Sequence, residues 1–233
     1  MTPALAIRTS PLRAGTFSAQ NHVIATMDGF LTDPAEAVGR AFLHNFAEIT
    51  PQYPGVRAPL DPASASQWSA ALSPMLSDVF GEQPGQWAMQ AWYSIVTCPP
   101  AQLMPTQRLP HVDGTNPRQI AMMLYLNRTG HGGTAFFRHR STGLEALTAA
   151  DWPRYKAALE GEIARGGLPP AAYVTDGAPH FERIHATSGT FNQAVFYRGN
   201  LLHSGVIDNA APLPGDPREG RLTINAFFRP PGV

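Results

Sequence analysis

The chain has 233 residues, with 17 lysines and arginines against 17 aspartates and glutamates, so that its formal net charge is zero. This length suits one domain with a full hydrophobic core. A neutral balance argues against nucleic acid or an anionic membrane surface as the partner. The only cysteine, Cys98, excludes an intrachain disulfide and a cysteine-based zinc cluster, and makes a reducing, cytoplasmic setting the expectation.

No apolar run approaches the roughly 18 residues that a membrane-spanning helix needs. The start of the chain also lacks the apolar core of a signal peptide. The 23 prolines and 21 glycines predict frequent chain reversals. We therefore expect a soluble protein, without a membrane partner, that is built from many short strands.

The first clear local signal in the chain is helical. Asp33 can cap a helix that starts at Pro34, and apolar residues recur at helical spacing behind it. This pattern predicts a helix over about residues 33–49. The proline-rich stretch 50–66 predicts no regular structure, and a short helix is expected near Pro74 to Phe80.

From about Gln86 the chain turns to short aromatic or β-branched runs that glycine, proline or asparagine separate. Six runs predict strands: QWAMQAWYSIV, IAMMLYLN, GTAFFRH, FNQAVFY, LLHSGVI and RLTINAFF. An insertion at about 141–190, with a helix expected at about 152–165, interrupts them. We expect a single, mainly β domain with flanking helices, in which residues 1–85 form a helical support and residues 86–233 an antiparallel barrel or sandwich.

His111 and Asp113 stand two residues apart just before one of these strands. In extended backbone, residues i and i+2 point to the same side, so the imidazole and the carboxylate can face one point. One more imidazole would complete the two-histidine, one-carboxylate face that leaves three positions open on Fe(II). Alone, the His-x-Asp pattern is weak, because many unrelated chains contain it.

The order of the downstream motifs strengthens this interpretation. They are MMLYLN at 122–127, GHGGTAFF at 130–137, NQAVFYRGNLLHSG at 192–205 and RLTINAFF at 221–228. Together with the His-x-Asp motif they resemble the Fe(II)- and 2-oxoglutarate-dependent dioxygenases, nearest to the prolyl-hydroxylase-like branch, over roughly Trp87 to Arg229. The resemblance implies a double-stranded β-helix, the jelly-roll or cupin-like form of barrel.

The resemblance also implies roles for particular residues. The iron ligands would be His111, Asp113 and His203, and Arg221 would bind the far carboxylate of 2-oxoglutarate. A guanidinium suits that task, because its planar fork donates two parallel hydrogen bonds to a carboxylate. Strand alternation puts Thr223 on the same face as Arg221, which makes Thr223 a candidate second donor, and Tyr125 is a third.

The implied cofactors are Fe(II), the cosubstrate 2-oxoglutarate and O2. Because Asp113 stands where a glycine or alanine would free a position for a halide, hydroxylation of a C–H bond is favoured over halogenation. The expected substrate is a small molecule or a peptide side chain. The resemblance does not decide between them, since one fold serves many substrates.

Several alternatives stay open in the sequence. His185 competes with His203 as the third ligand, and Arg218 competes with Arg221 as the anchor. His131 and His139 could each line a substrate pocket. The insertion at 141–190 is either a lid or wall of the site or a plain decoration. The chain could also be a cupin-like metal protein or a binding domain without turnover.

Overall fold

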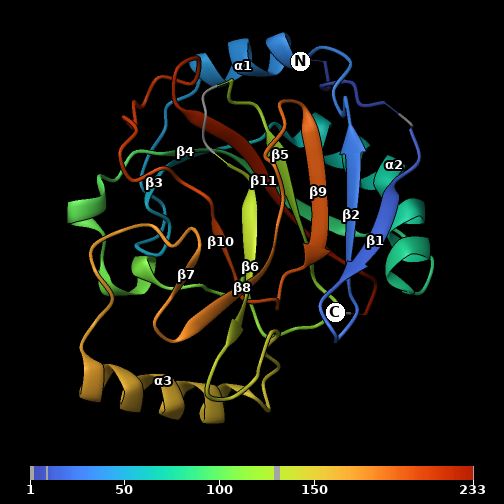
Figure 1. Ribbon diagram of the computed structural model, residues 1–233. Coiled ribbons are helices and arrows are strands. Elements are labelled where there is room, and N and C mark those ends of the chain that lie inside the picture. The colour runs from blue at the N-terminus through green and yellow to red at the C-terminus, as the bar shows by residue number, and fades with distance from the viewer. Residues whose placement is uncertain (1–2, 9, 129–131, 233) are drawn as a thin grey trace.

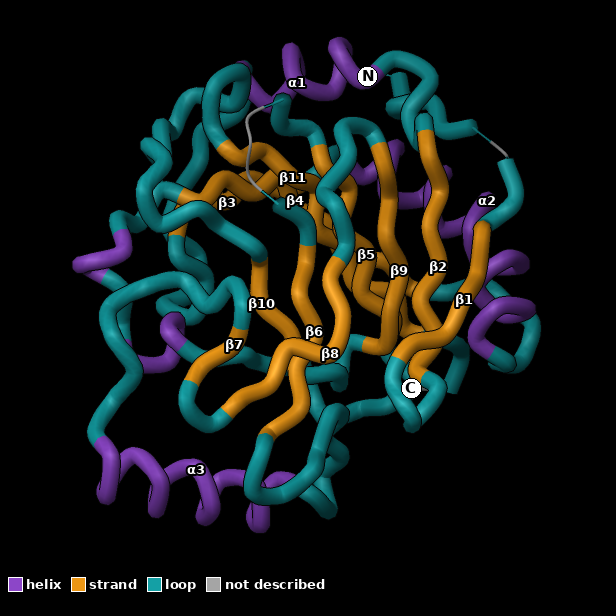
Figure 2. The backbone as a smooth tube through the Cα atoms, viewed as in Figure 1, coloured by secondary structure: helices purple, strands orange, loops and turns teal. Residues whose placement is uncertain are grey.

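The computed structural model describes residues 3–8, 10–128 and 132–232. The described residues form two antiparallel sheets and three α-helices (Figures 1 and 2). The helices are α1 (Pro34–Phe42), α2 (Pro62–Phe80) and α3 (Trp152–Gly166), with 3-10 turns at Pro100–Gln102 and Pro105–Arg108. The strands are β1 (Arg13–Phe17), β2 (His22–Asp28), β3 (Gly55–Pro59), β4 (Ala88–Val96), β5 (Ile120–Tyr125), β6 (Thr134–His139), β7 (Gly177–Ala178), β8 (Phe181–Ala186), β9 (Gln193–Arg198), β10 (His203–Gly205) and β11 (Arg221–Arg229).

The strands wind back and forth between the two sheets. The larger sheet has the order β1-β2-β9-β5-β11-β4-β3, and the smaller sheet has the order β10-β6-β8-β7. The segment at His111 extends the smaller sheet, because it forms an antiparallel bridge with His203 of β10. From β4 onward the chain passes from the large sheet to the small one and back three times. This winding is a double-stranded β-helix, so the predicted fold class is confirmed.

The last strand, β11, shows how the sequence sets the two faces of the large sheet. Leu222, Ile224 and Ala226 are buried in the hydrophobic core that α2 shares with the sheet. Arg221 and Asn225 line a cavity on the opposite face. The alternation of apolar and polar residues therefore separates the core from the cavity, as expected for a strand.

Helix α2 covers the outer face of the large sheet, and it begins earlier than the sequence suggests (Figure 1). We expected a short helix near Pro74, but α2 already starts at Pro62. Asp61 caps this end, and a proline is well tolerated in the first turn of a helix, where its missing N–H has no partner to lose. Pro74 lies inside the helix without ending it.

Helix α1 begins behind Asp33 as predicted but ends at Phe42 rather than near residue 49. The chain leaves the helix because Ala47 forms an antiparallel bridge with Arg57 of β3. The stretch 50–66, for which we expected no regular structure, contains β3 and the start of α2, so that prediction is wrong.

The prediction of a helical support over residues 1–85 is wrong in one respect. Three strands of that region, β1, β2 and β3, belong to the large sheet, two at one edge and one at the other. The hairpin of β1 and β2 closes through Ser18 and Asn21, which both adopt a positive φ, of 61° and 54°. The turn contains no proline or glycine that would predict it from the sequence. The hairpin joins the large sheet because β2 pairs with β9, and these two strands are far apart in the sequence.

The insertion at 141–190 is also shorter than expected. Helix α3 matches its prediction, but β8, at the end of the range, pairs with β6 and is therefore part of the smaller sheet. The weak apolar alternation of FERIHA explains the difference, because only Phe181 in this strand is fully buried. Helix α3 packs on the outer face of the smaller sheet, where Tyr155 contacts a core that includes Phe137.

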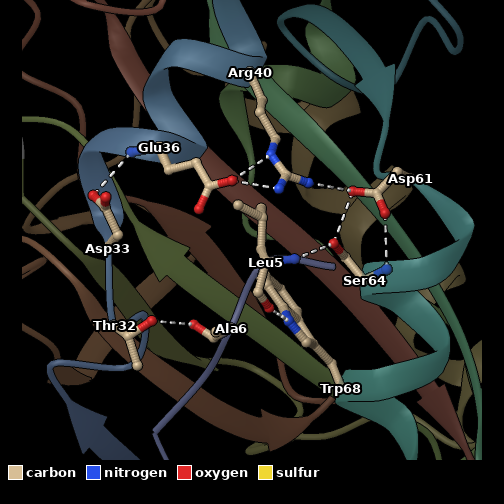
Figure 3. Close-up of polar contacts among 9 residues, drawn as sticks. All are labelled: Leu5, Ala6, Thr32, Asp33, Glu36, Arg40, Asp61, Ser64 and Trp68. Atoms are coloured by element: carbon tan, nitrogen blue, oxygen red, sulfur yellow. Dashed lines mark hydrogen bonds and ion pairs between the residues drawn. The ribbon is translucent and has the colours of Figure 1, made fainter. Parts of the chain in front are cut away.

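Polar contacts tie α1, α2 and the start of the chain together (Figure 3). Asp61 accepts hydrogen bonds from Ser64, from the backbone N–H and from the hydroxyl, both at 2.8 Å. The same hydroxyl accepts from the backbone N–H of Leu5 at 2.8 Å, and Trp68 donates to the carbonyl of Leu5 at 2.7 Å. Arg40 of α1 reaches Asp61 at 3.6 Å. Asp61 is therefore more than a helix cap.

We expect Asp61→Ala to lower the free energy of unfolding by about 2 kcal/mol, the upper end for loss of a helix cap. The matched control is Asp33→Ala, because Asp33 caps α1 through one exposed hydrogen bond to the backbone of Glu36. The control should cost about 1 kcal/mol or less. Urea unfolding of both variants measures the difference. Equal losses would show that the contacts of Asp61 beyond the cap contribute nothing.

Of the helices in the described ranges, none is apolar enough over sufficient length to cross a membrane.

Candidate metal centre

His111, Asp113 and His203 come together at one end of the smaller sheet. The backbones of His111 and His203 exchange two hydrogen bonds, of 2.9 and 2.8 Å, and the N–H of Asp113 donates to the carbonyl of Gly199 at 2.8 Å. One ligand atom from each of the three side chains lies within 4.8 Å of the others. The strand pairing thus brings the distal histidine to the His-x-Asp segment.

The atoms that face one another are those a metal would use. Nε2 of His111 lies 3.9 Å from Oδ1 of Asp113, and Nε2 of His203 lies 3.6 Å from Oδ2. Nδ1 of His203 is 2.8 Å from the carbonyl oxygen of Leu201. Because a carbonyl only accepts, Nδ1 carries the proton, which leaves the lone pair of Nε2 directed at the centre.

The electrostatics of the three groups suit a cation. Burial raises the pKa of Asp113 to about 6. Burial lowers the pKa of His203 to about 4, and burial together with the neighbouring His203 lowers the pKa of His111 to about 4. The His111 side chain is 56% accessible and lines the cavity. Both imidazoles are therefore neutral near pH 7 and free to coordinate.

Two observations indicate that a metal ion fits this site. Oδ2 of Asp113 is buried, and none of the described residues donates a hydrogen bond to it. A buried carboxylate oxygen without a partner is costly unless a cation meets it. The donor set, two imidazoles and one carboxylate, is the one that binds Fe(II) on one face and leaves the opposite positions open.

The three side chains line a cavity of about 340 Å³ between the two sheets. This volume is at the lower end of the roughly 300–1,000 Å³ that small-molecule sites occupy. Arg221, which is only 2% exposed, also lines the cavity. A Cβ at Gly205 would lie 3.5 Å from a terminal nitrogen of this guanidinium, so Arg221 packs directly over the backbone of β10.

Arg221 is held in place but lacks a counter-charge. One terminal nitrogen of its guanidinium donates to the carbonyls of Gly132 and Gly133, at 3.3 and 3.0 Å. Its Nε is buried without a hydrogen-bond partner, and no described carboxylate lies within 4.0 Å of it. A buried cation without a carboxylate partner is suited to bind an anion from outside the chain.

The other two predicted binding residues lie beside Arg221 but behind the wall of the cavity. The hydroxyl of Tyr125 is hydrogen-bonded to those of Thr134 and Thr187, at 2.8 and 3.2 Å. The hydroxyl of Thr223 donates to Oδ1 of Asn225 at 2.7 Å. Both hydroxyls are thus engaged within the protein, and neither residue is part of the cavity lining.

The rival residues lie elsewhere. His185 stacks on Phe17 with 4.7 Å between the ring centroids. Arg218 forms an exposed ion pair with Asp216 at 2.7 Å. His139 does not line the cavity either, because its ring is buried against Thr142 and Glu162, at 2.8 and 3.0 Å. His131 lies outside the described residues.

Several lining residues have no role assigned from the sequence, among them Tyr53, Tyr173 and Arg57, whose position the sequence leaves open. Tyr53 and Arg57 belong to the stretch YPGVR, whose proline and glycine mask a strand. Tyr173 follows α3 in the insertion, and its hydroxyl donates to the carbonyl of Cys98 at 2.6 Å. The loop behind α3 thus supplies part of the cavity wall, while α3 itself packs on the outside.

A family model described as a family of unknown function, DUF6445, matches residues 9–228. No curated protein matches the chain.

Similar solved structures include the non-heme α-ketoglutarate-dependent epimerase SnoN from nogalamycin biosynthesis, with 12% identity, 90% of this chain and 81% of that chain covered, and a TM-score of 0.47. HygX from Streptomyces hygroscopicus, with nickel, 2-oxoglutarate and hygromycin B bound, has 13% identity, coverage of 90% and 84%, and a TM-score of 0.47. EctD from S. alaskensis with bound iron has 14% identity, coverage of 98% and 83%, and a TM-score of 0.47. Similarity of this degree does not transfer a substrate or a residue's role.

Proposed function

The chain belongs to DUF6445, a family of unknown function, and we propose that it is an Fe(II)- and 2-oxoglutarate-dependent oxygenase. The reaction would convert 2-oxoglutarate, O2 and a substrate C–H bond into succinate, CO2 and a hydroxyl group. One observation carries the proposal. A two-histidine, one-carboxylate cluster and a buried arginine without a counter-charge line the same cavity.

We assign the metal to His111, Asp113 and His203. Bound there with the cosubstrate and oxygen, Fe(II) would supply the oxidising power that no amino-acid side chain offers. The protein's own part is to hold and orient. The hydrogen bond from His203 to the carbonyl of Leu201 fixes the imidazole, and the backbone bonds of Asp113 and His111 fix the segment that carries the other two ligands.

We assign the far carboxylate of 2-oxoglutarate to Arg221. Its guanidinium is already oriented by the carbonyls of Gly132 and Gly133, so little conformational freedom is lost when the anion binds. Tyr125 and Thr223 would support this end of the cavity from behind, through Thr134 and Asn225, which both line it. The apolar lining, such as Val112, Ile207 and Phe227, keeps water from the reacting atoms.

The remaining assignments are parts of the same proposal. The substrate would be a small molecule or a peptide side chain, and the product a hydroxylated one. A reducing, cytoplasmic setting agrees with the one free thiol, Cys98.

An anaerobic titration tests the proposal. Metal-free protein with Fe(II) and 2-oxoglutarate should develop the weak visible absorption of an iron-chelated α-keto acid, and neither component alone should produce it. In air the same sample should release succinate slowly, even without a substrate. If Fe(II) binds but saturating 2-oxoglutarate produces no band and no succinate, the metal serves a cupin-like or structural role and the oxygenase assignment fails.

A further inference from the structure

Arg57 is a second cation in the cavity, and it enters from a different strand. It lies on β3, where its N–H and carbonyl bond to Ala47 at 2.8 and 3.0 Å and the strand pairs with β4 on the other side. Backbone contacts on both sides therefore fix its position. In the register of the sheet Arg57 is opposite Ser94, which is itself opposite Thr223. Cα atoms two strands and two residues apart, as those of Arg57 and Arg221 are, lie roughly 12 Å from each other.

The guanidinium of Arg57 has an aromatic support but no counter-charge. Its Cζ lies 4.0 Å from the centroid of the Tyr53 ring and 6.0 Å from that of Trp92. Its Nε is buried without a hydrogen-bond partner. No carboxylate of the described chain comes within 4.0 Å of it. Burial lowers the pKa of Arg57, which still leaves it protonated at neutral pH.

Arg57 is the arginine whose charge acts on the proposed metal ligands. The charge of Arg57 acts on Asp113 and His111 and that of Arg221 on Tyr125, Tyr173 and Tyr197, while both arginines act on Tyr53. Asp113 cannot serve as the partner of Arg57, because the proposed metal takes that carboxylate. An anion from outside the chain would supply the missing counter-charge.

We propose that Arg57 anchors a carboxylate of the substrate, so that the substrate is a small monocarboxylic acid whose reacting carbon lies near the metal. This inference rests on the proposed function and names its substrate class. A single guanidinium offsets one negative charge and matches a planar carboxylate with two parallel hydrogen bonds. Among the described residues, the lining contains no lysine and no arginine besides Arg57 and Arg221, so a doubly charged phosphate would find too little positive charge.

The rest of the lining describes the body of the substrate. Tyr53, Pro54 and Ile207 offer apolar surface, and Thr50 and Gln107 offer uncharged polar groups. Within the part of the chain that the structure describes, Asp113 is the only acidic residue of the lining, and the proposed metal takes its carboxylate. No described carboxylate of the lining is left for an ammonium group, so a carboxylic acid with an apolar body fits better than a zwitterionic amino acid.

Thermal unfolding with defined carboxylates tests the inference. The probes are acetate, hexanoate and benzoate, each beside its amide, added to protein that already holds Mn(II) and 2-oxoglutarate so that Arg221 is occupied. At least one acid should raise the midpoint of unfolding while its amide does not. In Arg57→Met the same acid should bind at least about 30-fold more weakly, the lower bound for loss of one partner of a buried ion pair.

The variant's own stability separates anchoring from a structural role. Without added acid, Arg57→Met should be as stable as the natural protein or more so, since the arginine is a half-buried charge without a carboxylate partner among the described residues. If Arg57 only packs on Tyr53, the variant should unfold at a lower temperature and bind the acid unchanged. Arg57→Lys keeps the charge but not the fork and should recover part of the binding.

Three results would overturn the inference. The first is that no acid raises the midpoint of unfolding. The second is that an acid and its amide raise it equally. The third is that Arg57→Met binds the acid as tightly as the natural protein does. A variant that loses the shift with 2-oxoglutarate instead would make Arg57 part of the cosubstrate site. If 2-oxoglutarate has no effect on the natural protein while an acid still binds through Arg57, the proposed function fails but the carboxylate site stands.

Discussion

Replacing His203 with alanine should weaken Fe(II) binding by well over 100-fold and stop succinate formation. Loss of a residue that merely orients a metal ligand already costs about 10- to 100-fold in affinity, and His203 would contribute the bond itself. Its imidazole is only 6% exposed and lies 3.6 Å from Asp113, and its backbone pairs with that of His111, so the ligand atom is held at the cluster from both the strand and the side chain. Equilibrium dialysis of Fe(II) or Mn(II) under argon measures the loss.

The matched control is His185→Ala. His185 lies on β8 of the same small sheet, and its ring stacks on Phe17 rather than facing the cluster. This variant should lose some stability but retain the natural affinity for the metal. If both variants bind Fe(II) equally well, the cluster is not the metal site, and the assignment of all three ligands falls with it.

Replacing Arg221 with methionine should raise the dissociation constant for 2-oxoglutarate by about 30-fold to several thousand-fold, because truncation of one partner of a buried ion pair costs about 2–5 kcal/mol. The affinity for Fe(II) should change little, since Arg221 does not contact the three ligands. The carbonyls of Gly132 and Gly133 lose a donor in this variant, so a lower unfolding temperature is also expected. Titration of the visible band with 2-oxoglutarate gives the constant directly.

Arg218→Met is the control for this change. Arg218 follows β10 in the same loop that precedes Arg221, but its side chain is exposed, pairs with Asp216 and lies 4.0 Å from the ring centroid of Phe42. We expect no change in the affinity for 2-oxoglutarate. A loss in Arg218→Met with none in Arg221→Met would move the anchor from the strand to the loop.

The sequence predicts those parts of the site that depend on local pattern. Alternation along RLTINAFF puts Arg221 on the cavity side, and the spacing of His111 and Asp113 puts two polar groups on one face. It also predicts α3 within a residue of its observed bounds. In these segments the pattern of side chains and the backbone conformation are set by neighbours in the chain.

What the sequence does not predict depends on pairing over long distances. Arg57 reaches the cavity because β3 pairs with β4. The residues around it are rich in proline and glycine and show no alternation of apolar and polar side chains that would predict a strand. Likewise, Thr223 follows the alternation of Arg221 and Asn225 along β11, yet it does not line the cavity, and its hydroxyl donates to Asn225, two residues further along the same strand. Which of two neighbouring polar groups reaches a ligand is decided by packing within tenths of an ångström, and strand periodicity does not contain that information.

The place of β11 bears on how the molecule assembles. This strand follows all the others in the sequence, yet it lies between β4 and β5 and pairs with both. Until it is in place, each of those strands has an open edge, and exposed edges of this kind invite pairing with other chains. Contacts between distant parts of a chain also form slowly. Folding should therefore be limited by the insertion of this one strand, and partly folded chains should be prone to aggregate until it occurs.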